Sequence, residues 1–210
     1  MNGKQTKDMF LHVADVMVKS EEFLTDIDNK IGDGDHGIGM ATGFKGVQKS
    51  LKEQEFQYVN EVFHDIGMTM LCVMGGASGV LFGTVFISGI VGYEKKKEFA
   101  LEDFGSVFVK SLEALKQRGK AQIGDKTMID ALEPASLALS EGAKRGYDIK
   151  AGFAYAAEAA RTGMEFTKTC KARFGRAKYY GEKAIGLQDA GATSVYLIFK
   201  AMAEWVEKNL

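Results

Sequence analysis

Residues 192–206 read ATSVYLIFKAMAEWV, and this stretch indicates the fold most clearly. Its apolar residues return every three to four positions, at Ala192, Val195, Tyr196, Phe199, Met202, Ala203 and Val206. That spacing places them in one stripe, about 100° wide or more, along one side of an α-helix. A stripe of this kind has to be buried against other elements, so the stretch predicts a helix that faces a core.

The helical period continues through most of the chain. Clear apolar stripes run along 10–27, 101–115 and 153–167, and weaker helical patterns cover 39–54, 58–74, 77–93 and 127–146. A polar gap near Ser20 interrupts the first stripe, and Pro134 either kinks its helix or marks the first turn. No alternating strand pair with a turn signal occurs, so we predict an all-α bundle of about eight helices.

The composition of the chain indicates its number of domains and excludes some classes of partner. The 210 residues, 46% hydrophobic and 26% charged, are typical of one folded domain spanning 1–210. A net charge of −1 gives no basic excess, so neither nucleic acid nor a membrane surface is expected as a partner. Two cysteines, Cys72 and Cys170, and a start without the apolar core of a signal peptide favour a reducing, cytoplasmic setting.

The stretch 66–93 contains no charged residue over 28 positions, long enough to raise the question of a membrane span. The sequence Gly75-Gly-Ala-Ser-Gly79 divides it into two pieces that are each too short to span. We therefore predict two buried helices that meet at a glycine loop, with Gly79 and Gly83 allowing close approach of the backbones.

The segment Asp28-Asn-Lys-Ile-Gly-Asp-Gly-Asp-His-Gly37 is the most informative for function. It holds three carboxylates, at Asp28, Asp33 and Asp35, with glycines that permit a tight loop. Three converging carboxylates repel one another unless a cation lies between them, and oxygen ligands suit Mg²⁺ or Ca²⁺. With a metal bound, the same loop becomes a clamp for phosphate.

The acidic loop has three other interpretations. An EF-hand requires ligands where the chain has Gly37 and Phe44, so that interpretation fails. The glycines of 32–37 formally match a dinucleotide fingerprint, but no strand precedes them and bare aspartates repel a pyrophosphate. A solvated acidic turn without any ligand remains open.

Further glycine motifs could complete a phosphate site. The 75–79 motif opens a helix and offers Ser78, since helix N-termini attract phosphate. The stretch 119–127, GKAQIGDKT, misses a Walker A motif by one residue, and we read it as a loop with a cationic tip and an N-cap at Thr127. Arg176 either offers its guanidinium to a phosphate oxygen or forms a surface salt bridge, and Asp189 either caps the last helix or accepts a ribose hydroxyl. His12 and His64 lie on polar helix faces, so His36 is the histidine expected at the site.

Five motifs together resemble the family of ADP-binding L subunits (DhaL) of dihydroxyacetone kinase, in the branch linked to the phosphotransferase system. The motifs are Asp28-x4-Asp33-Gly-Asp35-His36-Gly37, Gly-Gly-Ala-Ser78-Gly, Gly124-Asp-Lys-Thr-Met128-x-Asp-Ala, Gly-Arg176-Ala-x-Tyr-x-Gly and Asp189-x-Gly191-Ala. Each motif alone is weak, but they follow the family's order and span nearly the whole chain.

The resemblance implies an antiparallel barrel of eight α-helices with a nucleotide at one end. It implies that Asp28, Asp33 and Asp35 hold two Mg²⁺, and that Arg176 faces the charge that develops during transfer. It assigns the ADP site to His36, Gly37, Ile38, Gly39, Ala77, Ser78, Gly119, Met128, Arg176, Asp189, Ala190 and Gly191. The family's Gly-x-Asn-Met is here Gly-Ile-Gly39-Met, and its Asp-Pro-Gly-Ala is Asp-Ala190-Gly-Ala, which leaves the metal ligands intact.

The resemblance also implies partners. ADP stays bound as a cofactor, a phosphohistidine donor protein (an M subunit) rephosphorylates it, and the phosphoryl group passes to dihydroxyacetone, or a similar small ketose, on a separate K subunit. A homodimer of the chain is left open. So are two other functions. A nucleotide-binding domain of fatty-acid-kinase type would carry a long extension beyond Leu210, and a non-enzymatic Ca²⁺-binding helical module would use the same aspartates.

Overall fold

The structure is a computed structural model that describes residues 1–210, and it contains nine α-helices and no β-strand apart from one isolated bridge between Asn2 and Glu98. The α-helices are α1 (Gly3–Lys19), α2 (Glu21–Ile31), α3 (His36–Glu53), α4 (Val59–Val73), α5 (Gly76–Ile87), α6 (Leu101–Gly119), α7 (Ile129–Lys144), α8 (Ile149–Phe166) and α9 (Ala190–Asn209). Two 3₁₀ segments, η1 (Thr167–Thr169) and η2 (Arg176–Ala184), lie between α8 and α9.

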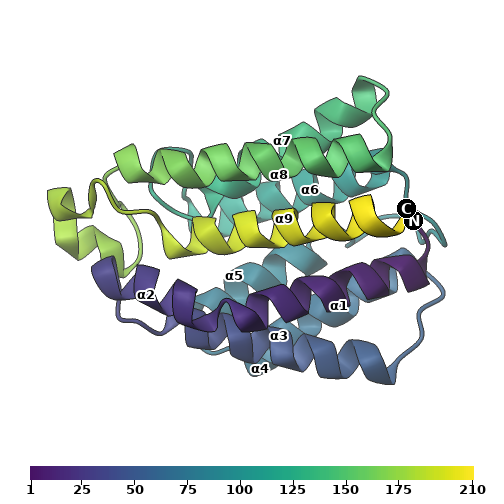
Figure 1. Cartoon of the computed structure of the whole chain (residues 1–210), viewed down its shortest axis with the longest axis horizontal. Helices are drawn as coiled ribbons and strands as arrows, with labels where there is room; N and C mark the ends of the chain where they lie inside the picture. Colours follow the sequence, from purple (N-terminus) through teal and green to yellow (C-terminus); the bar gives the residue numbers. More distant parts are fainter.

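Eight of the helices form a closed ring. Following the packed pairs, α1 contacts α3, α3 contacts α4, and the chain order then continues through α9, which contacts α1 again. The helices run up and down along the long axis, and both termini lie at one end (Figure 1). The prediction of an all-α antiparallel barrel of about eight helices is therefore confirmed, with α2 as an additional helix that packs on α3 and α9.

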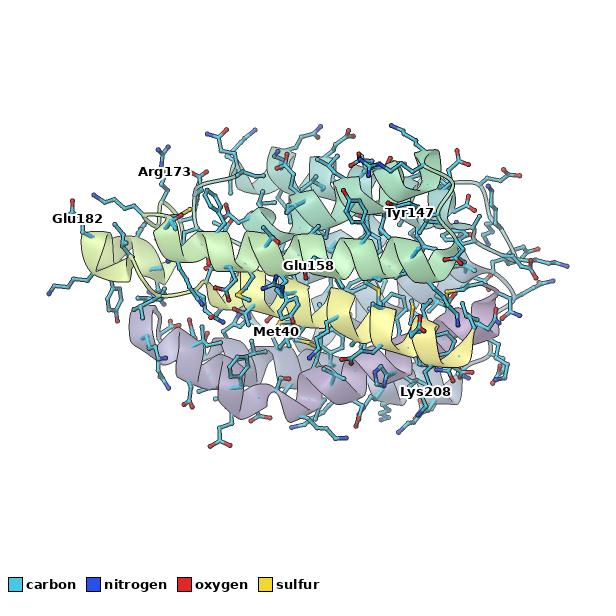
Figure 2. All side chains as sticks on the ribbon, turned by 45° about the horizontal axis from the view of Figure 1, so that its top comes forward. Met40, Tyr147, Glu158, Arg173, Glu182 and Lys208 are labelled. Carbon is cyan, nitrogen blue, oxygen red and sulfur yellow. The ribbon has the colours of Figure 1, made fainter.

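A single apolar core fills the ring. It contains 44 buried hydrophobic residues, among them the phenylalanines that line the barrel interior. Phe199, from the stripe that predicted the last helix, has its ring centroid 5.1 Å from that of Phe108 on α6. Polar and charged side chains project around the outline of the bundle, with Arg173 and Glu182 near the η2 end and Lys208 at the other end (Figure 2).

The first predicted helix is in fact two helices. The polar gap at Ser20 ends α1, because the Ser20 hydroxyl donates to the Val16 carbonyl at 2.8 Å and α2 starts afresh at Glu21. Pro134 lies in the second turn of α7 and not in the first, and the helix continues through it to Lys144. The segment 77–93 is helical only as far as Ile87.

The uncharged stretch 66–93 forms the packed pair α4 and α5, as expected, but the two helices are not fully buried, since Met68, Leu71 and Val80 are exposed. A methyl group added at Gly67 would lie 2.9 Å from the Gly83 carbonyl oxygen, so these two glycines allow the helix backbones to approach closely. No helix in the structure combines the length and the apolar character that crossing a bilayer requires. The break between the two helices is short, and Ala77, Ser78 and Gly79 belong to the first turn of α5.

The up-and-down topology gathers particular helix ends. The end of α2 and the beginnings of α3, α5, α7 and α9 all lie at the end of the barrel opposite the termini (Figure 1). The η2 segment extends from the same end. Except for Gly119 at the end of α6, the residues predicted for the metal and nucleotide sites belong to these helix ends, to the loop between α2 and α3, or to η2.

Candidate functional site

The acidic loop connects α2 to α3 and folds its three carboxylates together. Gly32 ends α2, and Gly34 has a φ of +77°, a conformation that glycine adopts without strain. Each of Asp28, Asp33 and Asp35 offers an oxygen, and these oxygens lie within 4.8 Å of one another. The predicted metal ligands are therefore brought together.

The electrostatics of the loop suit a bound cation. Partial burial raises the pKa of Asp35, and the negative charges of Asp33 and Asp28 raise it further. The donor set consists of carboxylate oxygens alone, which favours a hard divalent cation such as Mg²⁺ or Ca²⁺ over a softer metal. The residues present thus fit the metal that the family resemblance implies.

Arg176 reaches this loop from 143 residues further along the chain. Its Nε donates to Asp33 Oδ2 at 2.8 Å, and the Tyr180 hydroxyl donates to the Gly32 carbonyl at 3.4 Å. The Arg176 side chain is 70% exposed, so this ion pair contributes little to folding. The contact places a guanidinium at the edge of the carboxylate cluster, where a phosphate oxygen held by the metal loop would also lie within its reach.

His36 begins α3 and is buried. Its backbone N–H donates to Asp28 Oδ2 at 3.2 Å, which ties the first turn of α3 to the metal loop. Its Nε2 lies 2.7 Å from Ser194 Oγ on α9, and burial lowers the imidazole pKa, so the ring is neutral near pH 7. The side chain thus joins α3 to α9, and Ser194 is a site neighbour that the sequence did not reveal.

Most of the other predicted nucleotide residues lie at helix N-termini. His36–Gly39, Ala77–Ser78 and Ala190–Gly191 occupy first turns, and Met128 is the N-cap of α7. A Cβ built on Gly191 would lie 3.4 Å from Met128 Cβ, so the beginnings of α7 and α9 touch. Free N–H groups and the positive ends of helix dipoles make such positions suitable for phosphate.

Two glycines of the predicted site face open space. A Cβ at Gly39, or at Gly119 on the end of α6, would meet nothing within 4 Å. The structure therefore leaves room beside both glycines. Gly39 is the position at which the family pattern has Asn, and the free space means that the glycine is not required for packing.

Asp189 is the N-cap of α9, which confirms one of its two predicted roles. Its carboxylate accepts a hydrogen bond from the Ala192 N–H at 2.7 Å. Burial raises the pKa of Asp189 to about 6. The second role, accepting a ribose hydroxyl, stays a prediction.

The predicted cationic tip in the 119–127 loop is wrong. Lys126 is 1% exposed, and its ammonium donates to backbone carbonyls instead of facing solvent. The N-cap of α7 is Met128, while the Thr127 hydroxyl accepts from the Ile129 N–H at 3.2 Å. Asp130 shapes the loop, because its carboxylate accepts from Gly124 N–H at 2.6 Å and from Thr127 N–H at 2.8 Å.

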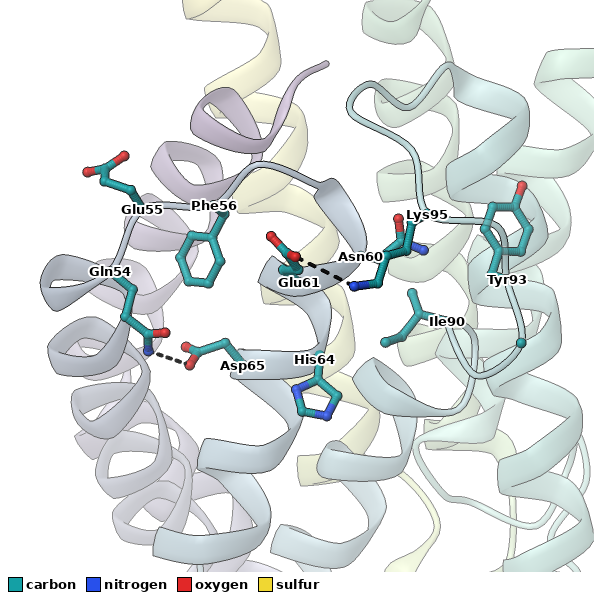
Figure 3. A pocket seen from close by; sticks show the side chains of 11 residues that line it. Gln54, Glu55, Phe56, Asn60, Glu61, His64, Asp65, Ile90, Tyr93 and Lys95 are labelled. Carbon is teal, nitrogen blue, oxygen red and sulfur yellow. Dashed lines mark hydrogen bonds and ion pairs between the residues drawn. The ribbon is translucent and has the colours of Figure 1, made fainter.

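A cavity of about 640 Å³ lies at the other end of the barrel, between the start of α4 and the loop that follows α5 (Figure 3). Some of its polar side chains are paired with one another. Glu61 forms an ion pair with Lys95 at 3.8 Å, and Gln54 donates to Asp65 at 2.8 Å. None of the predicted metal or nucleotide residues lines this cavity, so the acidic loop remains the candidate site.

Known proteins that are similar to this chain show the family to which it belongs. Residues 30–204 match the model of the DAK2 domain. The chain is 36% identical over 189 residues to the PEP-dependent dihydroxyacetone kinase, ADP-binding subunit DhaL, of Escherichia coli (strain K12), covering 90% of both chains. It is 39% identical over 186 residues to the ADP-binding subunit DhaL of PEP-dependent dihydroxyacetone kinase 1 of Listeria innocua, covering 89% of this chain and 88% of the relative.

A solved structure is similar over nearly the whole chain. It is the dihydroxyacetone kinase from C. freundii in complex with AMP-PNP and Mg²⁺, with a TM-score of 0.74 and 27% identity. The match covers 97% of this chain but 34% of that kinase, so the chain corresponds to about a third of the larger protein. The barrel architecture is therefore one that a nucleotide-binding kinase uses.

Proposed function

This chain belongs to the DAK2 domain family, and from that membership we propose that it is the ADP-binding L subunit of a phosphoenolpyruvate-dependent dihydroxyacetone kinase. In this role it holds Mg-ADP as a cofactor. It takes part in passing a phosphoryl group from a phosphohistidine donor protein to dihydroxyacetone, or a similar small ketose, on a K subunit.

The observation that carries the proposal is the convergence of three carboxylates at the barrel end where four helices begin. Asp28, Asp33 and Asp35 present oxygens within 4.8 Å of one another, and we assign two Mg²⁺ to them. Bound Mg²⁺ supplies positive charge to phosphate oxygens during phosphoryl transfer. The same carboxylates without a metal would repel a nucleotide, so metal and nucleotide are expected to bind together.

The nucleotide lies across the helix N-termini in this proposal. The first turns of α3, α5 and α9 and the N-cap of α7 contribute His36, Gly37, Ile38, Gly39, Ala77, Ser78, Met128, Asp189, Ala190 and Gly191. Gly119 at the end of α6 and Arg176 complete the set. Backbone N–H groups at these ends donate to phosphate oxygens without the cost of reorganising side chains.

Arg176 is the proposed catalytic residue. Its guanidinium is exposed and already lies at the carboxylate cluster, so it can turn toward a phosphoryl group held there. A cation placed beside the negative charge that develops in the transition state lowers the activation barrier more than it strengthens ground-state binding. The chain needs no general base for this step, because activation of the ketose belongs to the K subunit.

None of the three histidines is placed to capture a ketose. His36 is buried against Ser194, His12 on α1 lies 3.9 Å from Glu204, and His64 lines the cavity at the far end of the barrel. This arrangement supports a separate ketose-binding subunit as a partner. The relatives named above are themselves described as subunits of a PEP-dependent kinase.

A coupled assay tests the proposal. Purified chain with Mg²⁺, ATP and dihydroxyacetone should give no sustained product, and activity should appear when a K subunit and a phosphohistidine donor are both added. Native mass spectrometry of the protein as purified should find ADP bound. Multiple turnovers by the chain alone would refute the subunit assignment. A chain that binds Ca²⁺ but no nucleotide would instead favour a calcium-binding module.

A further inference from the structure

Lys126 is a charged side chain that the site described above does not use. It is 1% exposed, and it is one of only two non-glycine residues with a positive φ, at 58°. Left-handed backbone at a bulky residue persists only where the surrounding contacts enforce it. Burial of an ammonium group also has to be compensated by hydrogen bonds. Both features indicate that this lysine is held in place for a reason.

The Lys126 ammonium connects two segments that follow it in the chain. It donates to the Thr167 carbonyl at 2.6 Å, at the end of α8, and also to the Leu187 carbonyl, just before α9. The Thr167 hydroxyl in turn accepts from the Asp189 N–H at 3.0 Å. Burial lowers the pKa of Lys126, while the negative charge of Asp189 raises it. The lysine therefore helps to fix where α9 begins.

The neighbouring residue holds the other end of the same segment. The Asp125 carbonyl accepts from the Arg173 N–H at 3.1 Å, and its carboxylate lies 3.3 Å from Arg173 Nε. Residues 174–186, which carry Arg176, thus leave the barrel beside Asp125 and return beside Lys126. Two adjacent residues fix both ends of the loop that brings Arg176 to the acidic cluster.

Lys126 also lies two positions before Met128, the N-cap of α7. By donating to the Thr167 and Leu187 carbonyls, it sets the position of the start of α9 relative to that N-cap. Asp189, Ala190 and Gly191 lie at this start. A Cβ on Gly191 would stand only 3.4 Å from Met128 Cβ, so a small shift at either helix start changes the surface between them. The Lys126 ammonium forms no hydrogen bond with the α2–α3 loop that carries the carboxylates.

We propose that Lys126 is a positioning residue for the ADP site: it holds the start of α9 against the start of α7 and fixes the returning end of the Arg176 loop. This inference rests on the proposed function. It makes Lys126 an indirect determinant of nucleotide affinity, since it orients groups that would contact ADP without contacting ADP itself. Preorganised groups of this kind reduce the cost of ordering on binding.

The test compares Lys126→Met with two controls. Methionine keeps the unbranched length of the side chain and removes the ammonium. Lys183→Met removes an exposed lysine from the same loop, and Val59→Ala removes buried volume at the opposite end of the barrel. Mg-ADP affinity is measured by calorimetry, melting temperature by scanning calorimetry, and local opening by hydrogen exchange with mass spectrometry.

Lys126→Met should weaken Mg-ADP binding about tenfold or more and speed exchange in residues 170–190. Lys183→Met should bind within twofold of the parent. Val59→Ala should lower the melting temperature and still bind within twofold. If Lys126→Met does not fold, Lys126→Gln replaces it with the same expected outcomes, because glutamine is shorter and uncharged and so loses the ammonium contacts to the Thr167 and Leu187 carbonyls.

The outcomes separate the two proposals. A parent chain that does not bind Mg-ADP would overturn the proposed function and this inference with it. A parent that binds, with Lys126→Met binding equally well, would overturn the positioning role alone. An equal loss of affinity in Val59→Ala would also overturn it, since the effect would then follow global stability rather than the Lys126 contacts.

Discussion

Replacing Asp33 by Asn separates the metal-binding role of the acidic loop from its contribution to folding. Asp33 shares the cluster with Asp28 and Asp35, with oxygens at most 4.8 Å apart. Two unit charges at that distance repel by about 3.5 kcal/mol at an effective dielectric constant of 20, and by about 0.9 kcal/mol in bulk water. In the exposed loop, each repulsion has an energy between these two values. Asp33→Asn removes two such repulsions from the metal-free protein.

The same change removes the ion pair between Asp33 and Arg176. Because both side chains are exposed, that pair contributes about 0–1 kcal/mol. The free energy of unfolding of the metal-free variant should therefore rise by about 1 kcal/mol or more, because two repulsions are lost against one weak ion pair. Mg-ADP affinity should fall by about 3–5 kcal/mol, by analogy with removing one partner of a desolvated charge pair. At about 1.4 kcal/mol per factor of ten, this is roughly two to three orders of magnitude or more in Kd.

Calorimetric titration with Mg-ADP and thermal melting without ligand measure the two quantities on the same sample. Asp26→Asn is the matched control. Asp26 is exposed on α2 and does not belong to the cluster, and its replacement removes the same charge two residues before Asp28. The control should bind Mg-ADP nearly as tightly as the parent. Equal affinity in Asp33→Asn and Asp26→Asn would show that the metal assignment is wrong.

Three further predictions concern the same end of the barrel. Mg-ADP at about 100 times its Kd should stabilise the protein by about 2.7 kcal/mol, seen as a rise of about 5–10 °C in the melting temperature. EDTA should abolish that rise, and a rise that survives EDTA would contradict binding through metal. Arg176→Ala should lower the rate of phosphoryl transfer about 10²-fold with a smaller change in the Kd of ADP, and equal losses would make it a binding residue only. Asp189→Asn should make the stability to urea less dependent on pH. Burial raises the pKa of Asp189 to about 6, so the folded protein binds this proton more tightly than the unfolded chain. The stability of the parent protein therefore falls as the pH rises from about 4 through 6, and the variant should lack this fall. Asparagine can still act as the N-cap, so the variant isolates the effect of the carboxyl group. If the free energy of unfolding changes between pH 4.5 and 7.5 by the same amount in the variant as in the parent, Asp189 does not have a raised pKa.

Much of the fold could be predicted because helix formation follows a local period. The stripe in 192–206 lies within α9, and the patterns at 101–115 and 153–167 lie almost entirely within α6 and α8. The errors fall where local pattern and packing disagree. Residues 88–93 are apolar like the helix before them, yet α5 ends at Ile87 and the chain turns toward α6.

The convergence of the three carboxylates could be predicted for the same reason. Asp28, Asp33 and Asp35 lie within eight residues of one another, and the glycines between them restrict the ways in which the carboxylates can meet. The position of Lys126 could not be predicted in this way. A lysine beside glycine and aspartate is usually solvated, and its burial depends on Thr167 and Leu187, which lie 41 and 61 residues away.

Local patterns in the sequence predict most of the helices, the acidic loop and the glycine-rich helix starts, because each depends on residues within a few turns of one another. The packing of the whole chain selects which of these helix starts meet at one end of the ring. It also decided that Arg176 reaches Asp33 across 143 residues and that His36 packs on Ser194 across 158. The physical reason is that such contacts form when distant helices bury their apolar faces in one core, and a local pattern does not specify which faces will meet.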